Sequence, residues 1–154
     1  IYTAAAVGEV NVVTTMKQTQ AVIGGEGNGG VIYPPLHYGR DALVGIALFL
    51  SHLATSGKTC KELRNSYPQY VISKNKIELT PSIDVDSILE AIAKQYSNEQ
   101  ILTIDGVKID FTDSWVHLRK SNTEPIIRIY AEATSTEQAN KLAQQIISDI
   151  KNLI

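Results

Sequence analysis

Apolar residues recur at helical spacing in four stretches of the chain. This spacing predicts helices over residues 8–20, 39–56, 84–96 and 135–153, and a Thr59-x-x-Glu capping box predicts a short fifth helix. The helix over 39–56 is apolar on almost every side, so we expect it to be buried on most sides. The last helix carries a continuous apolar stripe that we expect to face a core.

Extended segments fill most of the remaining chain. In the first part they are 21–23, which we interpret as a buried strand, and 31–33. In the second part an extended segment at 69–80 is followed by four predicted strands, over 101–104, 107–111, 115–119 and 126–133. Asp105-Gly106 predicts a hairpin turn between the first two of these four.

The order of these elements predicts two domains that meet between Asn65 and Gln69. We expect residues 1–66 to form an α/β unit. We expect residues 67–154 to form an α+β domain of about four to five mainly antiparallel strands covered by two helices.

Composition narrows the class of protein. The chain has 154 residues, of which 44% are hydrophobic and 19% charged, as in globular domains. A net charge of −2 argues against a nucleic-acid partner. The single cysteine, Cys60, excludes an internal disulfide and predicts a packing role in a reducing compartment. The most apolar stretch, 43–50, is too short to span a membrane, so we expect a cytoplasmic protein. The absence of an initiator Met and a signal peptide suggests a part of a longer polypeptide.

A polar loop lies between the last two predicted strands. If the hairpin turns symmetrically about Thr123 and Glu124, Arg119 and Arg128 fall opposite each other, which destabilises a sheet. A phosphate dianion between the two guanidinium groups would reverse that repulsion. The turn adds hydroxyl, amide and backbone N–H donors from Ser121, Asn122 and Thr123. The alternative is a polar turn flanked by solvated arginines.

A glycine-rich loop covers residues 24–30. Gly25-x-Gly27-x-x-Gly30 matches the dinucleotide fingerprint, but an extended segment and Pro34-Pro35 follow in place of the required helix. Glu26 would also repel a pyrophosphate. Glu26 and Asn28 suit sugar hydroxyls instead, because a carboxylate accepts and an amide both donates and accepts. The alternative is a glycine turn with a solvated glutamate.

Both loops resemble motifs of the α-D-phosphohexomutases. Arg119-x-Ser121-Asn122-Thr123-Glu124-Pro125 followed by Arg128 resembles the phosphate-binding loop of their last domain, and 25–30 resembles the sugar-binding loop of their third domain. The resemblance implies phosphate contacts from Arg119, Ser121, Asn122, Thr123 and Arg128, and sugar contacts from Glu26 and Asn28. Many relatives carry His where Gly30 stands, so that histidine's role does not carry over. His37 could replace it or be an ordinary loop histidine.

The resemblance implies that 1–66 is the end of the third domain and 67–154 the fourth domain of a mutase. Such an enzyme interconverts hexose 1-phosphate and hexose 6-phosphate through a phosphoserine and a bisphosphorylated sugar, and phosphoglucosamine mutase or phosphoglucomutase/phosphomannomutase is the expected branch. The phosphoserine and Mg²⁺ motifs belong to the first two domains and do not occur here, so we expect no catalytic residue and no activity from this chain alone. Its expected partners are a hexose phosphate and the preceding domains.

Three other interpretations accompany this one. A non-catalytic anion- or protein-binding module is the alternative function. Asp105, Asp110 and Asp113 lack the spacing of a calcium loop, so we expect no metal site. Lys74-Asn75-Lys76 could reach an active cleft or form a solvated edge, and we interpret it as a solvated edge.

Overall fold

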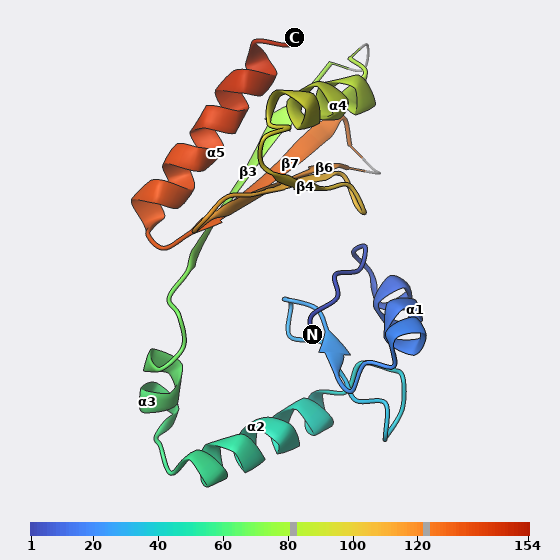
Figure 1. Ribbon diagram of the computed structural model, residues 1–154, viewed down its shortest axis with the longest axis vertical. Coiled ribbons are helices and arrows are strands. Elements are labelled where there is room, and N and C mark those ends of the chain that lie inside the picture. The colour runs from blue at the N-terminus through green and yellow to red at the C-terminus, as the bar shows by residue number, and fades with distance from the viewer. Residues whose placement is uncertain (81–82, 122–123) are drawn as a thin grey trace. The chain divides into compact units, whose positions relative to one another are not determined.

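The computed structural model describes residues 1–80, 83–121 and 124–154. Contacts between Cα atoms divide the chain into two compact units, Ile1–Pro68 and Gln69–Ile154. Each unit has its own helices and strands, shown as ribbons in Figure 1. Within the described residues, no helix combines the length and the apolar character needed to cross a membrane.

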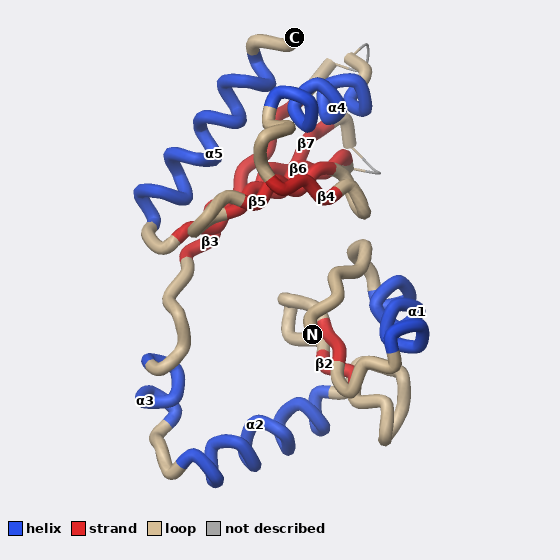
Figure 2. The backbone as a smooth tube through the Cα atoms, viewed as in Figure 1, coloured by secondary structure: helices blue, strands red, loops and turns tan. Residues whose placement is uncertain are grey.

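The first unit is built around a two-stranded antiparallel ladder. Its elements are α1 (Glu9–Thr19), β1 (Gly24–Gly25), β2 (Val31–Ile32), α2 (Ala42–Ser56) and α3 (Cys60–Asn65) (Figure 2). Gly24 pairs with Ile32 and Gly25 with Val31, so the glycine-rich loop closes a hairpin. The described core of this unit is small and consists of Met16, Ile32 and Leu63.

Three predictions for the first unit were wrong. Val22 and Ile23, predicted to lie in a buried strand, are 78% and 52% exposed, because pairing starts only at Gly24. Helix α2 forms as predicted, with the Asp41 carboxylate accepting from the Val44 N–H at 3.0 Å. None of its residues is buried, however: Val44, Leu48 and Leu53 are half-buried, and most of its other apolar side chains are exposed. Cys60 is exposed and has no packing role.

The second unit is a five-stranded antiparallel sheet with two helices. Its elements are β3 (Val71–Glu78), α4 (Val85–Gln95), β4 (Gln100–Leu102), β5 (Val107–Asp110), β6 (Trp115–Lys120), β7 (Ile126–Ala133) and α5 (Thr136–Lys151). The strand order is β3-β7-β6-β5-β4. This architecture confirms the predicted α+β layer, and the four strands after β3 lie within a residue or two of their predicted bounds.

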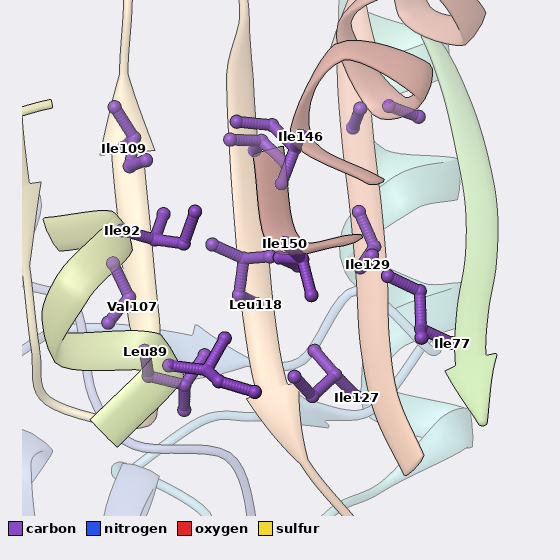
Figure 3. Packing of buried hydrophobic residues seen from close by; sticks show 14 of the residues in the cluster. Ile77, Leu89, Ile92, Val107, Ile109, Leu118, Ile127, Ile129, Ile146 and Ile150 are labelled. Atoms are coloured by element: carbon purple, nitrogen blue, oxygen red, sulfur yellow. The ribbon is translucent and has the colours of Figure 1, made fainter. Parts of the chain in front are cut away.

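One face of this sheet carries the hydrophobic core. Alternate residues of the strands, among them Leu118, Ile127 and Ile129, are fully buried against Ile146 and Ile150 of α5 and against α4 (Figure 3). Successive side chains of a strand point to opposite faces. The residues between these core positions therefore project from the face that the helices leave uncovered.

Local signals explain the ends of the elements in the second unit. Ser135 caps α5 by accepting from the Gln138 N–H, and Asp84 caps α4. Hydrogen bonds from the Ser87 hydroxyl and from backbone N–H groups lower the pKa of Asp84. The predicted β4–β5 turn has Gly106 at φ 71°, where a side chain is strained, and a Cβ there would lie 2.1 Å from the Leu118 carbonyl oxygen.

Candidate functional site

The two arginines of the polar loop face each other across neighbouring strands. Arg119 of β6 pairs in register with Arg128 of β7, and Ser121 N–H donates to the Ile126 carbonyl at 3.0 Å just beyond them. Residues in register project from the same face, which here is the face opposite the core. The predicted juxtaposition of Arg119 and Arg128 is therefore confirmed.

The surroundings of the two arginines differ. Arg119 Nη1 lies 3.2 Å from Asp105 Oδ2, and both side chains are 29% exposed. Arg128 is half-buried and forms no hydrogen bond or ion pair with the described part of the chain. The site therefore contains one guanidinium group neutralised by a carboxylate and one that has no counter-charge from the residues that the structure describes.

Part of the predicted loop can be placed. The Ser121 N–H is used in the hairpin, so it is not one of the backbone donors that we expected the turn to offer an anion. Asn122 and Thr123 lie outside the described residues. Of the five residues predicted to bind phosphate, the structure brings together Arg119, Ser121 and Arg128.

Aromatic and polar side chains cover the rest of this open face. Trp115 is half-buried, and its indole N–H donates to the Glu132 carboxylate at 3.0 Å. His117 Nε2 donates a hydrogen bond to the Asp105 carbonyl oxygen, 2.5 Å away. Asp105 therefore holds both His117 and Arg119, and it fixes the arginine relative to the β4–β5 turn.

The glycine-rich loop brings Glu26 and Asn28 together. The Glu26 carboxylate accepts from the Gly8 N–H at 3.1 Å through one oxygen and from Asn28 Nδ2 at 3.2 Å through the other. Asn28 Oδ1 accepts from the Gly30 N–H at 3.1 Å. A carboxylate has about four acceptor positions, so each oxygen of Glu26 keeps capacity for a ligand hydroxyl.

Asn28 also lines an open depression of about 470 Å³ in the first unit, together with Glu9, 29–31 and 40–42. Arg40 is held there by Glu9, whose carboxylate oxygens accept from its Nε at 2.8 Å and from its backbone N–H at 3.3 Å. The stem of Arg40 occupies the space where a side chain at position 30 would project, because a Cβ on Gly30 would lie 2.7 Å from Arg40 Cδ.

His37 belongs to a local turn. Its Nδ1 accepts from the Gly39 N–H at 2.9 Å, so Nε2 carries the proton and donates to Asp41 Oδ2 at 3.1 Å. The Val44 N–H and then His37 lower the pKa of Asp41. Both ring nitrogens of His37 are thus used in orienting the residue that caps α2.

Two ion pairs were not predicted from the sequence, the one between Asp105 and Arg119 and the one between Glu9 and Arg40. Asp105 lies 14 positions from Arg119, and Glu9 lies 31 positions from Arg40. No local spacing connects the members of either pair. For Asp105 a weak signal existed, since its turn was predicted, but the turn alone does not say which side chain reaches it.

Among the residues with described coordinates, no group of three or more His, Cys, Asp or Glu side chains could hold a metal ion. Lys108 pairs with Asp110.

Comparison with known proteins gives two matches to family models. Residues 2–70 match "Phosphoglucomutase/phosphomannomutase, alpha/beta/alpha domain III", and residues 76–148 match "Phosphoglucomutase/phosphomannomutase, C-terminal domain". The two matches follow one another along the chain in the order of their domain numbers.

Curated relatives and solved structures agree with these matches. A phosphoglucosamine/phosphogalactosamine mutase of Sulfurisphaera tokodaii is 41% identical over 142 residues, which are 91% of this chain and 31% of that protein. A phosphoglucomutase/phosphomannomutase of Thermococcus kodakarensis is 40% identical over 88% of this chain and 30% of that protein. A crystal structure of a phosphoglucomutase/phosphomannomutase family protein from Burkholderia thailandensis matches with a TM-score of 0.74 and 27% identity, over 95% of this chain and 31% of that chain. The chain thus spans about a third of the length of these proteins.

Proposed function

Because this chain belongs to the phosphoglucomutase/phosphomannomutase family, we propose that it is the substrate-recognition part of an enzyme that interconverts hexose 1-phosphate and hexose 6-phosphate. It would correspond to the end of domain III, residues 1–66, and to the C-terminal domain, residues 67–154. Amino sugars, glucose and mannose are the candidate hexoses. The relatives at about 40% identity carry both phosphoglucosamine and phosphoglucomutase/phosphomannomutase names.

The observation that carries this proposal is the paired register of Arg119 and Arg128. Two guanidinium groups side by side repel each other, and a phosphate dianion is the ligand whose charge and oxygen geometry suit both. Arg128 requires no rearrangement before it binds, since it has no counter-charge among the described residues. Arg119 would exchange Asp105 for phosphate. Ser121, Asn122 and Thr123 are proposed to complete the phosphate site.

The glycine-rich loop supports recognition of the sugar. Glu26 and Asn28 are fixed by each other and by backbone N–H groups, so their free acceptor and donor positions are preorganised. An enzyme that moves phosphate between two ends of one sugar must accept that sugar in two orientations. Contacts from Glu26 and Asn28 to hydroxyl groups near the middle of the ring would serve both orientations, while the two arginines hold the phosphate that is not transferred.

The chemical step itself is proposed to lie outside this chain. In the intact enzyme a phosphoserine would exchange its phosphoryl group with the sugar, assisted by Mg²⁺, and both would be supplied by the preceding domains. Positioning and charge stabilisation account for most of the catalysis of phosphoryl transfer, so a domain without reacting groups can still control the rate. Cytoplasmic localisation and inactivity of the chain alone remain predictions.

Helix α2 supports the proposed dependence on further polypeptide. Its apolar side chains are exposed, among them Leu43 at 78%, Ile46 at 54% and Leu50 at 54%. A helix that is apolar almost all round is normally buried. We assign the preceding part of the same mutase polypeptide as the partner that covers this helix.

The test is steady-state kinetics of the full-length protein that carries this chain, with glucosamine 6-phosphate and glucose 1-phosphate as substrates. Arg119→Ala should raise KM by about tenfold or more, because hydrogen bonds between charged groups contribute about 1.5–3 kcal/mol. Lys120→Ala is the matched control, since Lys120 is the next residue of β6, projects from the other face and pairs with Asp86. Unchanged KM and kcat in Arg119→Ala would count against the proposal, and binding without turnover would favour the non-catalytic module.

A further inference from the structure

A third cation lies in line with the two arginines. In the sheet, β7 lies between β3 and β6, and Arg128 pairs in register with Lys76 on one side and with Arg119 on the other. Ile77 of β3 and Ile127 of β7 belong to the core, so Lys76 and Arg128 both project from the uncovered face. Three positively charged side chains thus lie side by side on three neighbouring strands.

The ammonium group of Lys76 lies toward the polar loop. Its Nζ is 2.9 Å from Glu78 Oε1, and Glu78 pairs with Ile126, the first residue of β7 after the loop. Glu78, and more weakly Glu124 of the loop itself, raise the pKa of Lys76. The side chain is 59% exposed, so it can turn without loss of packing.

The three cations Lys76, Arg128 and Arg119 differ in whether a carboxylate is paired with them. Arg119 has Asp105 and Lys76 has Glu78, while Arg128 between them has no partner among the described residues. Side chains opposite each other on neighbouring strands start about 4.5–5.5 Å apart at Cβ, which a lysine spans easily. An anion seated over Arg128 is therefore within reach of both outer cations.

We propose that Lys76 is a further substrate-binding residue, which donates the third positive charge to the phosphate held by Arg119 and Arg128. This inference rests on the proposed function, because it assigns Lys76 to the same phosphate site. It also revises the interpretation of 74–76 as a solvated edge only. β3 is an edge strand, but its register brings Lys76 to the arginines.

The chain offers a matched control in Lys74. It lies on the same strand and face, but its register partner is Tyr130, and its Nζ is 5.6 Å from the centre of that ring. Lys74 is thus one row further from the loop than Lys76. Lys74→Gln and Lys76→Gln remove the same charge from the same strand at two different distances from the proposed phosphate.

The experiment measures glucosamine 6-phosphate binding by calorimetry and turnover by kinetics in the full-length protein and both variants. Lys76→Gln should weaken binding and raise KM by about five- to tenfold at low salt, and less at high salt, as expected for a solvent-exposed charge. Lys74→Gln should change both by less than about twofold.

The possible failures are distinguishable. Equal behaviour of the two variants, with normal binding and turnover in the unmodified protein, would overturn the role of Lys76 and leave the proposed function standing. Binding without turnover would overturn the proposed function, while the comparison of the variants would still decide on Lys76. Absence of binding in the unmodified protein would overturn both.

Discussion

Replacing Arg128 by methionine should stabilise the ligand-free C-terminal unit and, at the same time, weaken its binding of phosphate. Arg128 stands opposite Arg119 and has no counter-charge among the described residues. Methionine keeps an unbranched apolar stem of similar length, so the substitution removes mainly the charge. A residue kept for stability would not behave in this way.

The size of the expected stabilisation follows from the pairing of Arg128 with Arg119 across β7 and β6. Two unit charges about 6 Å apart in water repel by about 0.7 kcal/mol, and like charges opposite each other in a sheet cost a similar amount. Asp105 neutralises part of the charge of Arg119, which reduces the repulsion. We therefore expect Arg128→Met to raise the free energy of unfolding by about 0.5 kcal/mol, or the melting temperature by about 2–4 °C. Loss of the proposed hydrogen bonds from Arg128 to the phosphate should weaken phosphate binding by about tenfold or more.

The assay is urea unfolding of the 154-residue chain, followed by the fluorescence of its single tryptophan, Trp115, which lies on β6 close to the arginines. The gain should shrink at about 1 M KCl, where the Debye length is about 3 Å. Lys120→Met is the control, because Lys120 has an attractive partner 2.7 Å away in Asp86 and its loss should bring no gain. A lower urea midpoint for Arg128→Met at every salt concentration, or unchanged phosphate affinity, would refute the reasoning.

Three further predictions concern the scaffold of the second unit. Gly106→Ala should destabilise the unit by about 2–4 kcal/mol, because a Cβ would lie 2.1 Å from the Leu118 carbonyl oxygen at a φ of 71°; a loss below about 1 kcal/mol in urea unfolding would contradict this. Ile129→Ala should cost about 2–5 kcal/mol, since Ile129 is 0% exposed, and a loss of less than about 1 kcal/mol would mean that its site is not tightly packed. Desolvation, then the hydrogen bond to Asp149, raises the pKa of Tyr96 from 10.0 to about 12, so the neutral phenol favours the folded state. The contribution of the neutral Tyr96 phenol to stability should be complete below pH 10.0 and lost as the pH rises through about 12. The difference in phenolate absorbance between the unmodified chain and Tyr96→Phe should show a titration near 12 rather than 10.0.

Much of the C-terminal unit could be predicted from the sequence because its signals are local. Alternation placed the strands, Asp105-Gly106 marked the β4–β5 turn, and the symmetry of the last hairpin fixed Arg119 opposite Arg128. Side-chain caps at Asp84 and Ser135 placed the starts of both helices. Each of these signals depends on residues a few positions apart, which is the range over which sequence pattern is informative.

The predictions that failed, and the residues that were missed, depend on distant parts of the chain. The hydrophobicity of α2 indicates that it has apolar side chains to bury, but it does not indicate whether the same unit contains an element that buries them. The neighbour of β7 on its other side is β3, which lies about fifty positions earlier, so nothing local connects Lys76 with Arg128. The same holds for Arg40 and Glu9, whose contact lines the depression beside Asn28.

The most direct measurement is a crystal structure of the full-length protein bound to a hexose phosphate or bisphosphate. Our account predicts one phosphoryl group within about 3 Å of the guanidinium nitrogens of both Arg119 and Arg128, with the Arg119–Asp105 contact lengthened, and sugar hydroxyls on Glu26 and Asn28. A phosphoryl group bound elsewhere, with Arg119 still paired to Asp105 and Arg128 turned to solvent, would contradict it.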